Sequence, residues 1–201
     1  GMIASGLVNT GFQQLAIIIP MEREFGSLKR LRGTPMHVAS YFIGKSILVF
    51  VSMAIQVLLL LAAGIIFFGV ELPTDPYKWL TFTWLIIVGS AASTALGIAF
   101  ASVPKSGRGA SAVVSPVVIV LQFFSGVFFV FTDLPGWMQQ VAAIFPLKWM
   151  TQGMRSVFLP DSFAAREVAG TWETERTFII LLAWLIAGIF LAIRTFKWSR
   201  D

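Results

Sequence analysis

The chain has 201 residues, of which 57% are hydrophobic and only 12% are charged, and its mean hydropathy is +0.82. A soluble domain is about a quarter charged, so the composition excludes an ordinary soluble protein and predicts an integral membrane protein. The chain has no cysteine, and His37 is its only histidine. This excludes disulfides and thiolate metal sites, and it argues against a histidine metal centre or a Ser-His-Asp triad.

The net charge of +5 has to be interpreted from its distribution. The basic residues lie in loops beside apolar runs and do not form a basic face with interleaved aromatic residues. They are typical of topology signals, so we expect membrane lipid and no nucleic acid as a partner.

Five apolar runs approach or exceed the roughly 20 residues that cross a hydrocarbon core. We expect them at residues 2–19, 41–70, 80–103, 110–131 and 177–196. The predicted fold class is therefore all-α, a polytopic membrane helix bundle that forms one domain over residues 1–201. In the third run Gly89, Ser93, Gly97 and Ala101 recur every four residues and predict a seam for close helix packing.

The first run is the most polar. Ser5, Asn9 and Gln13 recur at a spacing of four, which places them on one face of a helix. A polar stripe within a span should face protein or a wet cavity and not lipid. Both readings stay open: the stripe packs against another helix, or it lines a pathway.

A charged stretch at residues 20–35 separates the first two runs. Phe25, Leu28 and Leu31 recur every three residues in it and predict one face of a short amphipathic helix between Pro20 and Pro35. Such a helix can pass force from a soluble motor to the spans; the alternative is a solvated basic loop. The six charged residues of the stretch are Glu22, Arg23, Glu24, Lys29, Arg30 and Arg32.

Residues 39–46 fit a loose phosphate-loop pattern, with Ala39 in place of the first glycine. We reject this match, because Tyr41, Phe42 and Ile43 are bulky and the flanking sequence predicts a span, whereas a phosphate loop follows a strand. Any nucleotide is expected to bind a different polypeptide.

The stretch after the fourth run is too short to cross the membrane and too apolar for an ordinary loop. A turn at 132–137 is followed by apolar pieces at 138–145 and 146–159, which predict interfacial or re-entrant helices. The segment at 161–176 is polar, and we expect it to be exposed.

Lysine and arginine counts beside the spans predict the orientation. Ten lie at 22–45, 104–109 and 194–200, and the other side has five, offset by seven acids. The charged stretch and the C-terminus are therefore expected to be cytoplasmic. Five spans then place residue 1 outside, so we expect at least one span to precede this sequence.

Two motifs resemble the permease subunit of ABC-2 type transporters, the membrane half of type-2 ATP-binding-cassette exporters. The first combines 21–24 with Gly26, 28–31, Thr34 and Pro35, followed by Gly44 and Lys45. The second combines 125–129 with 134–137, Pro146, Leu147 and Arg155. The family usually has six spans preceded by a cytoplasmic interfacial helix, so the first span and that helix are expected to lie outside this sequence.

The resemblance implies an exporter permease that is not itself an enzyme. It implies a second permease copy, in a homodimer or a heterodimer, and a separate cassette ATPase that carries ATP and Mg, while this chain holds no cofactor or metal. It also implies an integral protein of the bacterial or archaeal inner or plasma membrane, with the substrate path between the two permeases.

Three groups of residues take roles from the resemblance. The coupling helix, which seats in the ATPase, is expected at 22–35 with Glu22, Arg23, Glu24, Gly26, Leu28 and Arg30. The substrate path is expected to include Asn9, Gln13 and Gln122. The outer gate is expected to include Ser125, Gly126, Phe128, Phe129, Leu134, Pro135, Trp137 and Pro146.

Other function classes have weaker support. An ion-coupled carrier usually needs an ionisable residue at membrane depth, and none lies in 46–70, 80–103, 110–131 or 177–193. This leaves room for a sodium site made of carbonyl and hydroxyl oxygens, and a non-transporting scaffold also stays open. An intramembrane enzyme has no paired carboxylates within a span. The substrate class, whether drug, lipid, glycan or peptide, stays open.

Overall fold

The computed structural model describes residues 1–33 and 38–196. Thr34, Pro35 and His37, and the basic tail residues Lys197 and Arg200, lie outside these ranges.

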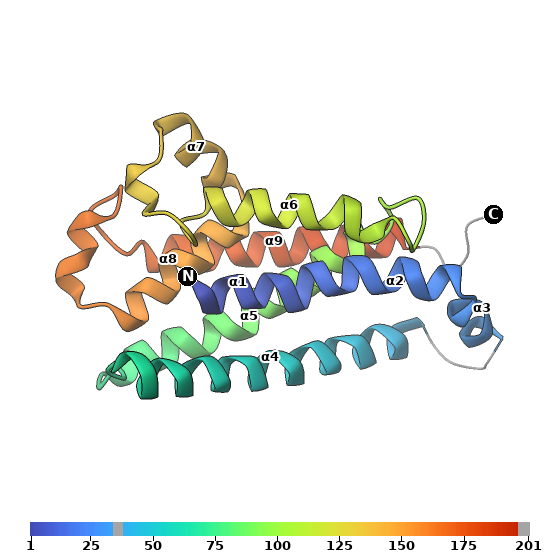
Figure 1. Ribbon diagram of the computed structural model, residues 1–201, viewed down its shortest axis with the longest axis horizontal. Helices are drawn as coiled ribbons and strands as arrows, with labels where there is room; N and C mark the ends of the chain where they lie inside the picture. The colour runs from blue at the N-terminus through green and yellow to red at the C-terminus, as the bar shows by residue number, and fades with distance from the viewer. Residues whose placement is uncertain (34–37, 197–201) are drawn as a thin grey trace.

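Every regular element in the described ranges is a helix, which confirms the predicted fold class. The long helices lie side by side in an elongated bundle (Figure 1). α3 lies near one end of it and α7 near the other, and these ends are called the α3 end and the α7 end below. The elements are α1 (Met2–Val8), η1 (Asn9–Gln13), α2 (Gln14–Glu24), α3 (Ser27–Arg32), α4 (Val38–Phe68), α5 (Pro76–Phe100), α6 (Ala110–Phe124), η2 (Phe131–Asp133), α7 (Gly136–Ile144), α8 (Pro146–Phe158), η3 (Asp161–Arg166) and α9 (Thr174–Thr195).

Within the described residues, four helices are long and apolar enough to cross a membrane. They are Met2–Glu24, Ser40–Phe68, Pro76–Phe100 and Thr174–Thr195. α6 is the fifth apolar helix, but its 15 residues reach only about 22 Å at 1.5 Å per residue. A hydrocarbon core is about 30 Å thick.

The expected fourth span at 110–131 is therefore too long, because α6 ends at Phe124. Gly126 has a φ of 75°, in the left-handed region that glycine adopts without strain. The N–H of Val127 donates to the carbonyl of Gln122, which closes the helix end in the pattern common for a glycine after the last turn. This turn redirects the chain before it reaches the full depth of a span.

The charged stretch also differs from its prediction. The first helix continues through Pro20 and ends at Glu24, and Gly26, with a φ of 74°, separates it from α3. Phe25 precedes α3 and is 66% exposed, whereas Leu28 is fully buried. Phe25 and Leu28 therefore do not share the apolar face of one helix, although the short helix itself is confirmed.

The second span begins at Val38, so residues 39–46 are helical and do not form a phosphate loop. The predicted short helices after α6 are confirmed as α7 and α8. α8 packs against α5 and α9, and its Trp149 and Met150 are almost fully buried. This helix is therefore part of the bundle core and not a surface loop.

α5 is the helix on which the bundle is packed. A Cβ atom at Gly97 would lie 2.7 Å from the carbonyl oxygens of Gly11 and Phe12, so the backbones of α5 and η1 touch at this crossing. A Cβ at Gly89 would meet the Met150 side chain at 3.2 Å. These contacts confirm the predicted small-residue seam and explain how two helices approach so closely.

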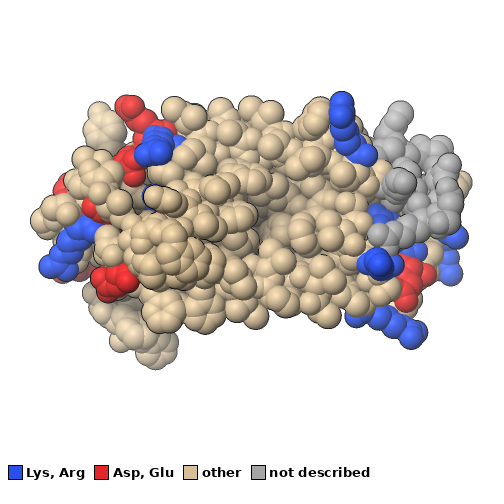
Figure 2. All heavy atoms as spheres, turned by 90° about the horizontal axis from the view of Figure 1, so that it is seen from above, with Lys and Arg blue, Asp and Glu red and all other residues tan. Residues whose placement is uncertain are grey.

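On the face drawn in Figure 2, charged side chains gather at the two ends of the molecule, with a wide uncharged belt between them. The belt is what a protein surface in contact with lipid requires. The four long apolar helices agree with it, so the protein is an integral membrane protein.

Candidate functional site

Glu22, near the end of α2, ties this helix to the first turns of α4. Its carboxylate accepts a hydrogen bond of 2.7 Å from the Tyr41 hydroxyl and pairs with the Lys45 ammonium at 2.5 Å. Lys45 is only 15% exposed. This ion pair is therefore shielded more than a surface pair would be, and it holds the two helices in one relative position.

Glu24 ties the same helix end to the turn between α5 and α6. One carboxylate oxygen accepts from the backbone N–H groups of Gly107 and Arg108, at 2.5 and 3.3 Å. A Cβ at Gly107 would lie 2.6 Å from the Cα of Met21, so only glycine lets this turn approach so closely. Together the two carboxylates connect the segment before α3 to α4 and to the α5–α6 turn.

The six residues expected in the coupling helix thus occupy different environments. Glu22 and Glu24 are engaged within the chain, and Gly26 makes the turn into α3. Leu28 is buried, whereas Arg30 is exposed. Arg23 lies beside Glu24 in the lining of a small cavity of 250 Å³, which also includes Lys29 and Lys105.

The expected path residues form hydrogen bonds between helices. The Gln122 amide of α6 donates to the Asn9 side chain at 2.9 Å, and the Gln13 amide donates to the Ser115 hydroxyl at 3.2 Å. The two residues of the first helix lie in η1, a π-helical turn of the kind often found at functional positions. The structure therefore brings Asn9 and Gln122 together, and Gln13 contacts the same helix, α6.

Thr10 and its partner were missed by the sequence analysis. The Thr10 hydroxyl donates to the Gln56 side chain of α4 at 2.8 Å. Polar pairs of this kind relieve the cost of placing polar groups in hydrocarbon. A spacing argument could not identify them, because the partners are far apart in sequence.

The expected outer-gate residues lie at the α7 end. Ser125 is buried, and its hydroxyl has no hydrogen-bond partner among the described residues. Phe128 and Phe129 are 59% and 54% exposed, and both rings contact Phe123 of α6. Leu134 and Pro135 lead into α7, Pro146 starts α8, and the exposed Trp137 contacts the ring of Phe124.

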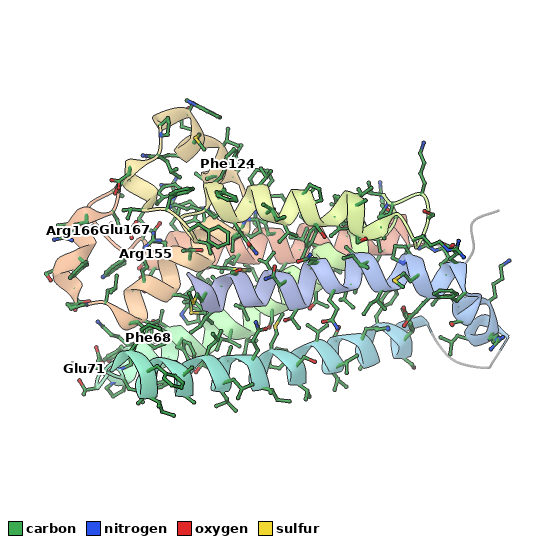
Figure 3. All side chains as sticks on the ribbon, in the orientation of Figure 1. Phe68, Glu71, Phe124, Arg155, Arg166 and Glu167 are labelled. Atoms are coloured by element: carbon green, nitrogen blue, oxygen red, sulfur yellow. The ribbon has the colours of Figure 1, made fainter. Side chains whose placement is uncertain are left out.

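Arg155 and Glu167 form a bidentate ion pair at the same end, with N–O distances of 2.7 and 3.1 Å (Figure 3). Arg155 is on α8, and Glu167 follows η3. Paired parallel hydrogen bonds fix both side chains in orientation as well as distance. The pair therefore anchors the polar segment after α8 to the bundle.

Lys148 of α8 is a buried cation that the sequence analysis missed. It is 5% exposed, its ammonium donates to the Gln152 side chain, and it lies 3.6 Å from the ring centroid of Trp149. Burial lowers the pKa of Lys148 from 10.5 to about 8, although the carboxylates of Glu173 and Glu167 act in the opposite direction.

Glu173, just before α9, lies near this cation. Burial would raise the pKa of Glu173, but hydrogen bonds from Arg176 and Gln152 and the charge of Lys148 together lower it. Glu173 also has a φ of 45°, in the left-handed region that side chains rarely adopt. This polar cluster therefore holds the start of α9 against α8.

The described part of the chain has no group of three or more His, Asp or Glu side chains that could hold a metal ion. The arrangement offers polar contacts between helices and ion pairs at both ends.

The family model described as ABC-2 type transporter matches residues 1–159. This range includes both motifs of the sequence and every residue placed above in the coupling helix, the path and the gate. No curated protein matches the chain.

The burial of Lys148 can be tested through the dependence of protein stability on pH. Between about pH 8 and pH 10.5 the folded protein releases the Lys148 proton while the unfolded chain retains it. Stability should therefore rise with pH over this window, since the unfolded state binds more protons. We expect the thermal midpoint of the wild type to rise relative to that of Lys148→Met, whose curve serves as the control for all other groups. Parallel curves for the two proteins would contradict the assignment.

Proposed function

Because the chain belongs to the ABC-2 type transporter family, we propose that it is the permease subunit of an ATP-binding-cassette exporter driven by a separate ATPase. Membership of this family means that the chain is a transmembrane component of a transporter. The coupling to an ATPase and the direction of transport are the proposal. The observation that carries it is the pair of carboxylates, Glu22 and Glu24, which connect the segment before α3 to other parts of the bundle.

In this mechanism α3 is the coupling helix and ATP with Mg binds on the partner. The exposed Arg30 contacts the ATPase, and the buried Leu28 holds α3 against the bundle. Movement of α3 then passes through Glu22 to α4 and through Glu24 to the α5–α6 turn. In this proposal the two acids pass the movement of α3 to other helices and do not contact the ATPase themselves.

The substrate path is proposed between two permease copies. The first helix and α6, joined by the hydrogen bond between Asn9 and Gln122, would form one wall of it. The α3 end is proposed to face the cytoplasm of a bacterial or archaeal cell. The excess of lysine and arginine at that end supports this orientation.

The outer gate is proposed at the turn after α6. The exposed rings of Phe128 and Phe129 lie beside Phe123 on α6, where a second copy would meet them. The left-handed conformation of Gly126 sets the position of these rings.

The coupling role is tested by reversing the exposed charge on α3. We predict that Arg30→Glu weakens association with the cassette ATPase several-fold and lowers export, because electrostatic complementarity at the contact is reversed. Insertion and folding should be unchanged, since Arg30 is exposed. The measurement is the amount of ATPase that co-purifies with the permease.

The control is Arg194→Glu, which makes the same charge change on α9 at the same end of the bundle. If ATPase recovery falls equally in both variants, the effect is one of general charge, and α3 is not the docking helix.

The gate is tested by adding one methyl group. In Gly126→Ala the new Cβ would lie 3.0 Å from the Cβ of Phe131, and the left-handed conformation costs about 1–2 kcal/mol for other residues. Export should therefore fall while ATPase recovery stays normal. Gly136→Ala, at a position with open space around it, is the matched control and should export normally. Normal export by Gly126→Ala would remove this turn from the gate.

A further inference from the structure

A cavity of about 620 Å³ opens at the α7 end, beside the turn that follows α6. One wall is the continuous stretch 126–133. The other wall comes from Arg155 of α8, from Leu159 directly after this helix, and from the polar segment that follows. The residues expected in the coupling helix and the path do not line this cavity, whereas Gly126, Phe128 and Phe129 of the proposed outer gate do. A function assigned to this cavity therefore rests on that proposed gate.

The walls of the cavity are largely aromatic. Phe128, Phe129 and Phe131 line one side, and Phe163 and Trp172 line the other. The cavity begins just past the end of α6, and its Arg155, Arg166 and Glu167 lie at the α7 end (Figure 3). Charged side chains gather at the ends of the molecule, next to the uncharged belt (Figure 2). This is the level at which a lipid head group meets its acyl chains. A ligand there must have both an apolar and a polar part.

Four charged side chains line the cavity, and they differ in how they are paired. Arg155 and Glu167 neutralise each other in their bidentate ion pair. Arg166 stacks on the ring of Phe163, 4.7 Å from its centroid, and forms no ion pair with any acid in the described ranges. Asp133 is exposed and likewise has no ion-pair partner among the described residues. The cavity thus offers one unpaired cation and one unpaired anion.

We propose that this cavity binds a zwitterionic phospholipid, with the phosphate at Arg166, the amine at Asp133 and the start of an acyl chain along the aromatic wall. A guanidinium suits a phosphate oxygen through directed N–H donors, and a carboxylate beside aromatic rings suits an ammonium group. The lining has no net charge, so a lipid of net negative charge would leave Asp133 opposed to it. The site would function as a lipid-binding site on the outer gate, and it does not depend on the direction of transport.

The test uses bilayer nanodiscs that always contain equal amounts of phosphatidylethanolamine and phosphatidylglycerol, with brominated chains on one lipid at a time. Bromine quenches a nearby fluorophore, so the loss of fluorescence reports which lipid lies beside it. The overall lipid composition stays the same in both samples, because only the brominated lipid changes. The fluorophore is attached to Thr132→Cys, at the exposed rim of the cavity, in a chain without native cysteine. The control is Gln140→Cys, which is exposed on α7 and does not line the cavity.

At Thr132→Cys we expect brominated phosphatidylethanolamine to quench about threefold more effectively than brominated phosphatidylglycerol, the size typical of partly exposed ion pairs. At Gln140→Cys the two lipids should quench equally. Asp133→Asn should shift the preference toward phosphatidylglycerol, because it removes the anion that binds the amine and gives the lining a net positive charge. Arg166→Gln should abolish the binding of either phosphate.

Three results would overturn the proposal. Equal quenching by both lipids at Thr132→Cys would mean that only bulk lipid reaches the rim. Stronger quenching by phosphatidylglycerol would identify an anion site. The absence of quenching at Thr132→Cys, with normal quenching at Gln140→Cys, would mean that no acyl chain enters the cavity. Both charge variants alter exposed side chains, and the retained but shifted lipid preference of Asp133→Asn separates a change of binding from a loss of folding.

Discussion

Hydrocarbon offers no hydrogen-bond partner, so a polar side chain within the belt is stabilised by a partner within the protein. The first helix shows how the chain meets this constraint. Asn9 and Gln13 bond to α6, and Thr10 bonds to α4. The glycine crossing between η1 and α5 brings the backbones of these two elements into contact. The first helix is thus joined to α6 and α4 by polar side chains and to α5 by a pair of glycines.

At the α3 end, polar groups near the belt are likewise paired within the chain, and these pairs join α2 to its neighbours. Glu22 is shared between a tyrosine and a lysine of α4, and Glu24 accepts from two backbone N–H groups of the α5–α6 turn. Breaking either set would leave charged or polar groups without partners near the belt, which is costly. A displacement of α3 is therefore expected to move these segments with it. Glu22 and Glu24 thus connect segments within the chain, which supports the proposed transmission of movement from α3.

Much of the architecture could be predicted from the sequence because apolar runs and charge counts depend on local composition. The four long spans, the short helices after α6 and the glycine seam on α5 were all predictable in this way. The early end of α6 was not, because it depends on the left-handed conformation of Gly126, which the apolar residues that follow conceal.

The partners of Glu22, Thr10 and Arg155 could not be predicted either. Each pair joins segments that are distant in sequence or separated by a turn, so the spacing of residues within one helix cannot predict the contact. The burial of Lys148 could not be predicted, because a lone lysine usually reaches solvent. The structure was therefore needed to identify the residues of the candidate site that join distant elements.

The proposed function depends most on α3 being the cytoplasmic docking helix for an ATPase. The most direct measurement is the labelling of Ser27→Cys, an exposed position in the first turn of α3, with a thiol reagent that cannot cross the membrane. The account predicts that the reagent reaches this cysteine only from the cytoplasmic face and that the bound ATPase protects it. Labelling from the outer face, or equal labelling with and without the ATPase, would contradict it.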